Sequence, residues 1–301
     1  MSTLLTKNEF PFWKMHGAGN DFVVFDALST PLPADFDFAL TAQQMCARHF
    51  GIGADGLLLL EAASTPGSQV RMRMWNPDGS EDMCGNGLRC VARLAHENGH
   101  VAASEFIVET HAGLRACSVI DAELVRVEMG APQFDFSEIP LQPIVTRNER
   151  MEYSLRVAGQ EFPHTVSLST GSTHTVIFLD NDLSEEEFQT FSPPIENHEL
   201  FPERTTVMWA RVTGRSTLRV RIWERGAGET LACGTGACAT AVAAKITGRA
   251  DGAIGVQSKG GVLQIEWDGN APQNSDEKKG RPIFMTGPTA FVFHGCFKLS
   301  V

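Results

Sequence analysis

The chain has 301 residues, and its 36 acidic and 25 basic side chains give a net charge of −11. No basic stretch is available to neutralise phosphates, so neither a nucleic acid nor an anionic membrane is the expected partner, and a small molecule is favoured. The seven cysteines lack the dense spacing of a secreted disulfide scaffold, so we expect reduced thiols and a cytoplasmic location.

The opening segment, residues 1–12, contains Lys7 and Glu9 and has no long apolar core. It therefore predicts neither a signal peptide nor a membrane span, and we expect a short tail before Trp13.

Two short patterns follow. A capping-box pattern at residues 41–44 predicts the start of a helix that runs through Met45. Residues 51–56 match the dinucleotide-binding fingerprint letter for letter. They follow a helix and precede a strand, which is the reverse of the required order, so they indicate a tight turn.

A cysteine-glycine cassette then appears twice in the chain. Residues 84–90 read Cys-Gly-Asn-Gly-Leu-Arg-Cys, and residues 233–238 read Cys-Gly-Thr-Gly-Ala-Cys. Each copy follows a run of alternating apolar and arginine residues that ends in tryptophan, at residues 70–75 and 218–223. The period of two predicts strands with one buried face. The apolar spacing after each cassette predicts an enclosed helix with the cassette at its N-terminus.

The repetition extends to the flanking segments. Residues 16–26 are echoed by residues 170–180, and residues 125–132 by residues 282–288, in the same order along the chain. This pattern indicates duplication of a whole domain. We therefore predict an α+β fold of two pseudo-symmetric domains, each a curved, mostly antiparallel sheet or barrel wrapped around a central helix.

The predicted domain boundaries follow from these repeats. Residues 1–132 with 288–301 form the half that carries Cys84, and residues 133–287 form the half that carries Cys233. Residues 270–281 are polar and predict a solvated hairpin loop.

The cassettes indicate racemisation or epimerisation, because adding a proton to one face of a carbon while removing it from the other needs two equivalent bases. Glycines at a helix start leave backbone N–H groups unpaired, and these can hold a carboxylate and stabilise its enolate-like dianion. The same position lowers the pKa of a cysteine, which makes a thiolate available as a base. A single such cassette would more often be a turn with a buried cysteine, but its duplication favours two catalytic thiols, Cys84 and Cys233.

Neither a metal ion nor a nucleotide cofactor is expected. Neither cassette has a Cys-x2-Cys knuckle, and no histidine pair has ligand spacing, so no metal site is predicted. The chain also lacks a Gly-Lys-Ser/Thr sequence for a nucleoside triphosphate. We interpret the remaining cysteines as core residues.

These residues closely resemble the diaminopimelate epimerase family over nearly the whole chain. The resemblance rests on the two cassettes and on residues 14–22, 48–56, 76–81 and 224–230. It implies cofactor-independent interconversion of L,L- and meso-diaminopimelate, with no pyridoxal phosphate or metal. It also implies two barrel-like domains that close over the substrate. Members of the family form dimers, so the resemblance implies a homodimer as well.

The resemblance further implies roles for individual residues. The backbone N–H groups of the cassettes would hold the α-carboxylate, and other side chains would orient the substrate or poise the thiols. The carboxylate-binding residues would be Gly85, Asn86, Gly234 and Thr235. The orienting residues would be Asn20, Asn76 and Arg225, whose guanidinium suits the distal carboxylate. His174 and Glu224 would lie near the reacting centre.

Two departures concern the distal end of the substrate. The family usually has asparagine where this chain has Ser172, and a substrate-binding asparagine where it has Thr206. A hydroxyl reaches less far than an amide and offers one donor where the amide offers two. The loop between Asn76 and Cys84 is also one residue shorter than usual. These departures leave the thiol chemistry intact and bear on the substrate.

Three functions are therefore open. The first is diaminopimelate epimerase, and the second is a related racemase of another amino acid, such as histidine, whose side chain suits Ser172 and Thr206. The third is a non-catalytic protein that senses oxidation through Cys84 and Cys233.

Overall fold

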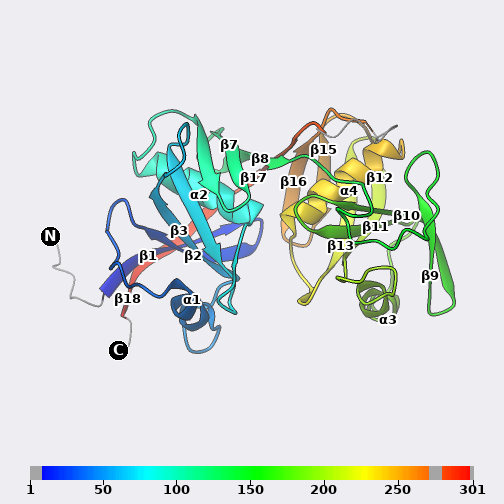
Figure 1. Cartoon of the computed structure of the whole chain (residues 1–301), viewed down its shortest axis with the longest axis horizontal. Coiled ribbons are helices and arrows are strands. Elements are labelled where there is room, and N and C mark those ends of the chain that lie inside the picture. The colour runs from blue at the N-terminus through cyan, green and yellow to red at the C-terminus, as the bar shows by residue number, and fades with distance from the viewer. Residues whose placement is uncertain (1–8, 271–279, 299–301) are drawn as a thin grey trace. The chain divides into compact units, whose positions relative to one another are not determined.

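The structure is a computed structural model that describes residues 9–270 and 280–298 (Figure 1). It divides into two compact units, residues 1–127 with 287–301 (unit 1) and residues 128–286 (unit 2). Most of the loop predicted at residues 270–281 lies outside the described residues.

Unit 1 is a ladder of strands in the order β18-β1-β2-β3-β4-β6-β7-β8. The pairs β2–β3 and β4–β6 are parallel and the others antiparallel. The strands are β1 (Glu9–Gly17), β2 (Asn20–Asp26), β3 (Gly56–Ala62), β4 (Val70–Trp75), β5 (Glu81–Asp82), β6 (Glu105–Thr110), β7 (Gly113–Val119), β8 (Leu124–Gly130), which runs into unit 2, and β18 (Ala290–Lys298); the helices are α1 (Phe38–Cys46) and α2 (Gly85–Glu97).

Unit 2 repeats this ladder as β9-β10-β11-β12-β13-β15-β16-β17, with β11–β12 and β13–β15 parallel. The order of parallel and antiparallel pairs is the same in both units, which confirms the predicted α+β fold with two related halves. The strands are β9 (Tyr153–Val157), β10 (Gln160–Ser169), β11 (Thr173–Phe178), β12 (Thr206–Gly214), β13 (Thr217–Glu224), β14 (Gly228–Glu229), β15 (Ile254–Ser258), β16 (Gly261–Glu266) and β17 (Ile283–Pro288); the helices are α3 (Glu185–Glu196) and α4 (Gly234–Ile246).

Each unit encloses the helix that follows its cassette, as the sequence predicts (Figure 1). Helix α2 contacts β1, β2, β3, β4 and β7, and helix α4 contacts β10, β11, β12, β15 and β16. In α4, all eight residues from Ala237 to Ala244 are buried. A helix without a polar face must be covered on all sides, and the surrounding strands cover it.

A glycine allows each central helix to approach its sheet closely. A Cβ atom at Gly87 would lie 2.8 Å from Leu58 Cδ2, and one at Gly236 would lie 2.6 Å from Met208 Sδ. Leu58 and Met208 are fully buried in β3 and β12. The second glycine of each cassette is therefore required by packing.

A second helix covers the opposite face of each sheet. Helix α1 contacts β3 and β4, and helix α3 contacts β9, β12 and β13. In unit 2 this outer core joins Phe188 to Ile177 and Trp209, all buried.

Three local predictions in unit 1 are wrong, and one of them concerns Cys296, which the sequence predicts in the core and which is exposed. Helix α1 begins after Asp37, whose side chain accepts from Leu40 N at 2.9 Å, so Asp37 is the N-cap. Thr41 is buried within the helix and donates to Asp37 O at 2.6 Å, which removes it from a capping role. The predicted N-terminal tail is also too long, because Glu9–Phe12 pair with β18 as part of β1.

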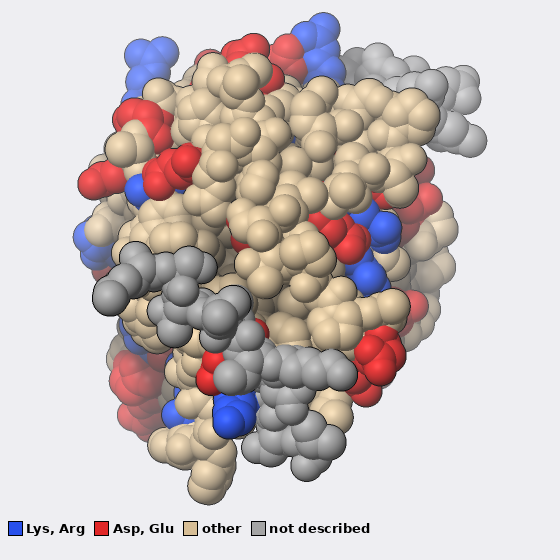
Figure 2. Space-filling model, turned by 90° about the vertical axis from the view of Figure 1, so that its left-hand side faces the viewer, with Lys and Arg blue, Asp and Glu red and all other residues tan. Residues whose placement is uncertain are grey.

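Figure 2 shows the side of unit 1 on which β1 and β18 lie, where uncharged residues fill much of the middle and charged side chains gather toward the rim. Strand β18 exposes Val292 and Phe293. Among the described residues, no helix combines the length and apolar character needed to cross a membrane.

We expect the substitution Gly87→Val to lower the free energy of unfolding by about 1–3 kcal/mol, because the added methyl groups overpack a buried site against Leu58. Urea unfolding measures this loss. Thr190→Val, at an exposed position of α3, is the control and should change stability by no more than about 0.5 kcal/mol. Equal stability of Gly87→Val and wild type would contradict the packing role of this glycine.

Candidate active site

Cys84 is the N-cap residue of α2 and lies against two asparagines. Its Sγ donates to Asn20 Oδ1 at 3.5 Å, and Asn86 Nδ2 donates to the same oxygen at 3.2 Å. Asn86 is 1% exposed, whereas Cys84 is half-buried. The structure thus brings together the predicted residues Cys84, Asn20, Gly85 and Asn86 within unit 1.

The position of Asn20 is held by Asp55, a residue that the sequence analysis left within a tight turn. Asn20 Nδ2 donates to Asp55 Oδ2 at 2.8 Å, and Asp21 N donates to the same oxygen at 3.1 Å. Arg48 binds the other carboxylate oxygen at 2.7 Å. Because the Asn20 amide nitrogen is engaged by a carboxylate, its carbonyl oxygen faces Cys84.

Cys233 is the N-cap residue of α4 and is 7% exposed. Its Sγ accepts from Gly236 N at 3.3 Å and lies 3.4 Å from Thr235 Oγ1 and 3.8 Å from His174 Nε2. The structure thus brings Cys233, Gly234, Thr235 and His174 together within unit 2. The Gly236 N–H that donates to this sulfur stabilises its negatively charged form.

His174 is fully buried on β11, and burial lowers its pKa to about 4, with the positive charge of Arg225 acting in the same direction. Its Nδ1 lies 2.7 Å from the carbonyl oxygen of Ser172. A carbonyl oxygen can only accept, so Nδ1 carries the proton of the neutral ring. Nε2 therefore presents its lone pair to Cys233 Sγ and can accept a hydrogen bond from the thiol.

The first turn of each central helix has backbone N–H groups that precede the first intrahelical bond. That bond runs from Leu88 N to Cys84 O at 2.8 Å in α2 and from Ala237 N to Cys233 O at 2.9 Å in α4. Two residues before each of these bonds therefore have N–H groups that lie outside the helical hydrogen-bond ladder, at the positive end of the helix dipole. They are Gly85 and Asn86 in α2, and Gly234 and Thr235 in α4.

The predicted residues Thr206 and Arg225 also meet. Thr206 Oγ1 accepts from Arg225 N at 3.1 Å, and Arg225 Nη1 donates to Glu203 O at 3.0 Å. The side chain of Arg225 is exposed. Thr206 thus holds the backbone of the turn that presents this guanidinium.

Glu196 supports the same turn and was missed by the sequence analysis. Its carboxylate is 5% exposed and accepts from Gly226 N at 2.8 Å, from Trp223 Nε1 at 2.7 Å and from Arg204 at 3.0 Å. A buried carboxylate with three donors fixes the loop around it. No local pattern marks Glu196, because its partners lie up to 30 residues away along the chain.

The remaining predicted residues lie at the ends of strands. Asn76 follows β4, and its Nδ2 donates to Ser80 Oγ at 3.1 Å within its own turn. Glu224 is the last residue of β13 and is half-buried, next to Arg225. The roles implied for these two residues stay predictions.

Strand register relates Ser172 to Asn20. His174 pairs with Thr206 as Phe22 pairs with Gly56, so Ser172 and Asn20, each two residues earlier, occupy equivalent positions. This register differs by two residues from the letter match between residues 16–26 and 170–180. Unit 2 therefore presents a serine hydroxyl where unit 1 presents an amide.

Two other cysteines are held in the neutral thiol form. Burial raises the pKa of Cys46 and of Cys90 to about 12, which keeps both as inert thiols at neutral pH. Among the residues that the structure describes, no three His, Cys, Asp or Glu side chains are grouped to hold a metal ion.

A sequence model of the family described as "Diaminopimelate epimerase" matches residues 12–135 and 166–292. The chain is also similar to the diaminopimelate epimerase of Moorella thermoacetica, at 43% identity over 96% of this chain and 99% of that protein. The enzyme of the same name from Pelotomaculum thermopropionicum is 42% identical over 94% and 97% of the two chains.

Solved structures share the fold. A hydroxyproline epimerase from Agrobacterium vitis with bound trans-4-hydroxy-L-proline aligns with a TM-score of 0.69 at 14% identity, covering 98% of this chain and 94% of that one. A PhzF-family protein from Bacillus anthracis aligns with a TM-score of 0.66 at 16% identity, over 97% and 99% of the two chains.

The low pKa of His174 predicts a pH dependence of stability. The unfolded chain takes up a proton on this residue near pH 6.5, whereas the folded chain does so only near pH 4. Folding stability due to neutral His174 is therefore complete above pH 6.5 and falls by on the order of 3 kcal/mol as the pH drops to 4. Urea unfolding at pH 7.5 and pH 4 should show this loss in wild type and a smaller one in His174→Gln. His111→Gln, which removes an exposed histidine, is the control. An equal pH dependence in all three proteins would contradict the buried neutral ring.

Proposed function

The chain belongs to the diaminopimelate epimerase family, and on this premise we propose that it interconverts L,L- and meso-2,6-diaminopimelate without a cofactor. The single observation that best supports this proposal is the equivalence of the two cassettes. Each unit places one cysteine at the N-cap of a helix enclosed by the same ladder of strands.

The reaction needs one proton acceptor and one proton donor. We propose that one cysteine, as thiolate, removes the α-proton, so that the C–H bond breaks and an S–H bond forms. The electron pair moves into the bond to the carboxylate carbon and gives an enolate-like dianion. The other cysteine, as thiol, then donates its proton to the opposite face of the carbon and becomes the thiolate. The two sulfur atoms have exchanged roles, and the reverse reaction uses the same groups.

The dianion is the costly intermediate, and the helix starts are suited to stabilise it. The backbone N–H groups of Gly85, Asn86, Gly234 and Thr235 stand outside the helical ladders and would donate to the α-carboxylate. Donors already fixed in place stabilise developing charge without reorganisation. An isolated carboxylate in water has no such arrangement.

Cys233 is the candidate for the resting thiolate. Gly236 N–H donates to its sulfur at the positive end of the α4 dipole, and both effects stabilise the thiolate. Cys84 instead donates to the Asn20 carbonyl oxygen, a contact that suits the protonated thiol. His174 and Glu224 would then poise the thiols, as the family resemblance implies.

The distal end of the substrate would be held by Arg225, whose planar guanidinium matches a carboxylate. Thr206 acts on it indirectly through the bond to Arg225 N. Asn20, Asn76 and Ser172 remain proposed substrate contacts. The cytoplasmic location and the homodimer stay predictions.

The second candidate is a racemase of another amino acid, such as histidine. The observation that favours it is the serine hydroxyl of Ser172 at the position equivalent to Asn20. A shorter side chain with one donor leaves room for a different distal group.

Solvent-exchange assays separate the candidates. Reduced protein free of pyridoxal phosphate is incubated in D2O with L,L-diaminopimelate and, separately, with L-histidine and other L-amino acids. We expect deuterium at the α-carbon of diaminopimelate together with formation of the meso isomer. Deuterium only in another amino acid would overturn the first candidate, and the absence of any exchange would leave the thiol sensor as the surviving hypothesis.

Cysteine variants test the roles of the thiols in the same assay. Cys84→Ser and Cys233→Ser should each lose about 10²–10⁴-fold in kcat/KM, since each removes an acid or base. Cys296→Ser, which replaces an exposed thiol, is the matched control and should keep wild-type activity. Full activity in either of the first two variants would refute the two-thiol mechanism.

A further inference from the structure

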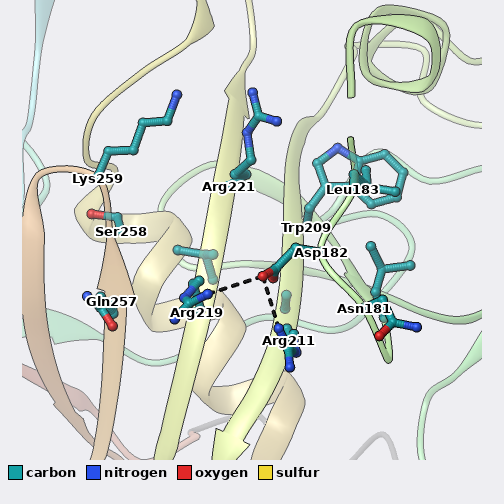
Figure 3. Close-up of a pocket in the computed structure, with 13 residues that line it drawn as sticks. Asn181, Asp182, Leu183, Trp209, Arg211, Arg219, Arg221, Gln257, Ser258 and Lys259 are labelled. Atoms are coloured by element: carbon teal, nitrogen blue, oxygen red, sulfur yellow. Dashed lines mark hydrogen bonds and ion pairs between the residues drawn. The ribbon is translucent and has the colours of Figure 1, made fainter. Parts of the chain in front are cut away.

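Unit 2 carries a pocket on the sheet face opposite to α4. Strands β12 and β13 alternate between two faces: Met208 lies against Gly236 of α4, whereas Trp209 belongs to the outer core with Phe188 of α3. The pocket has a cavity volume of about 300 Å³ and lies on this outer face. Its lining includes Trp209, Arg211, Arg219, Arg221, Gln257 and Lys259 (Figure 3). Cys233 and His174 are not among its residues.

Two arginines lie next to each other in this pocket. Arg211 on β12 pairs in register with Arg219 on β13. Their guanidinium groups donate to the same atom, Asp182 Oδ2, at 2.9 and 3.1 Å. Figure 3 shows the Asp182 carboxylate between them. Like charges directly opposite each other in an antiparallel pair destabilise a sheet, so this arrangement has a cost.

Unit 1 provides an internal comparison. Arg71 is the equivalent of Arg219, because Glu61 pairs with Arg71 as Arg211 pairs with Arg219. On the other side, Glu109 pairs with Arg71 as Gln257 pairs with Arg219. Arg71 Nε lies 3.5 Å from Glu61 and 3.6 Å from Glu109. Unit 2 has thus replaced both carboxylates that neutralise this arginine, one of them by a second arginine.

The surrounding charges leave the cluster positive. Arg221 binds Glu185 at 2.9 Å and Glu229 at 3.0 Å, and Lys259 binds Glu229 at 2.6 Å. With Arg211, Arg219 and Asp182, this charged cluster has four cations and three carboxylates. The cations are Arg211, Arg219, Arg221 and Lys259, and the carboxylates are Asp182, Glu185 and Glu229. This excess occurs in a chain whose net charge is −11.

The walls beside the cations are apolar. Leu179, Leu183 and Trp209 line the same pocket. The Arg221 guanidinium lies 3.6 Å from the centre of the Phe188 ring, which holds the guanidinium in place. A ligand that fits has an anionic group for the arginines and an apolar body for these walls.

We propose that this pocket binds a small organic carboxylate with an apolar body, at a site separate from the thiol of the same unit. The carboxylate takes the donors of Arg211 and Arg219 that do not bind Asp182, and supplies the negative charge that Glu61 and Glu109 supply in unit 1. The proposal does not depend on the reaction proposed above.

The test uses benzoate as the probe and the indole N–H signal of Trp209 in ¹⁵N-labelled full-length protein as the readout. We expect saturable shifts with benzoate, and at least tenfold weaker binding of benzamide, which has the same body without charge. Inorganic phosphate should also bind at least tenfold more weakly, because it lacks the apolar body. Equal binding of benzamide or phosphate, or no binding of benzoate, would overturn the proposal.

A double variant, Arg211→Glu with Gln257→Glu, installs the unit 1 arrangement around Arg219. We expect at least a tenfold rise in the benzoate Kd, with a melting temperature equal to or above that of wild type and unchanged basal activity. The matched control is Val292→Glu, which adds a carboxylate at an exposed position of β18 in unit 1 and should leave the Kd unchanged. An unchanged benzoate Kd in the folded double variant would contradict the assigned site.

Discussion

The close approach of each central helix to its sheet is the constraint on which the rest of the molecule depends. Gly87 and Gly236 stand where any Cβ would meet a buried side chain of the neighbouring strand. With only hydrogen at these positions, the first turn of each helix sits against the sheet, and the preceding cysteine is held at the helix start. The same placement leaves the early N–H groups outside the helical ladder, at the positive end of the helix dipole. Packing and the proposed chemistry thus depend on the same turn of each helix.

The two halves share this frame and differ in what surrounds the sulfur atom. In unit 1 the thiol faces an amide carbonyl fixed by Asp55. In unit 2 the sulfur receives a backbone N–H and faces a neutral, fully buried histidine. A strictly symmetric pair would give both thiols the same proton affinity. The observed differences favour opposite protonation states at rest, which is the arrangement that a two-base reaction requires at its start.

Features repeated along the chain could be predicted from the sequence, and features that depend on distant pairing could not. The cassettes, the alternating strands and the largely apolar α4 are local patterns, and the structure confirms the elements that they predict. The capping box at residues 41–44 failed because Asp37, four residues earlier, competes as N-cap. Asp55 and Glu196 were missed because they bind Asn20 and Gly226, which lie 35 and 30 residues away along the chain. The opposed arginines of unit 2 become visible only when strand register aligns them with the glutamates of unit 1.

The isotopic composition of substrate and product in the first turnovers tests the two-thiol reaction most directly. L,L-diaminopimelate is converted in D2O to a few per cent of completion, and the α-hydrogens of product and remaining substrate are measured by mass spectrometry. With two thiols of opposite protonation, the meso product carries one deuterium at the inverted carbon, and the remaining L,L substrate carries none. A single base acting on both faces would return the original hydrogen to the product or label both pools, and either pattern would contradict the account.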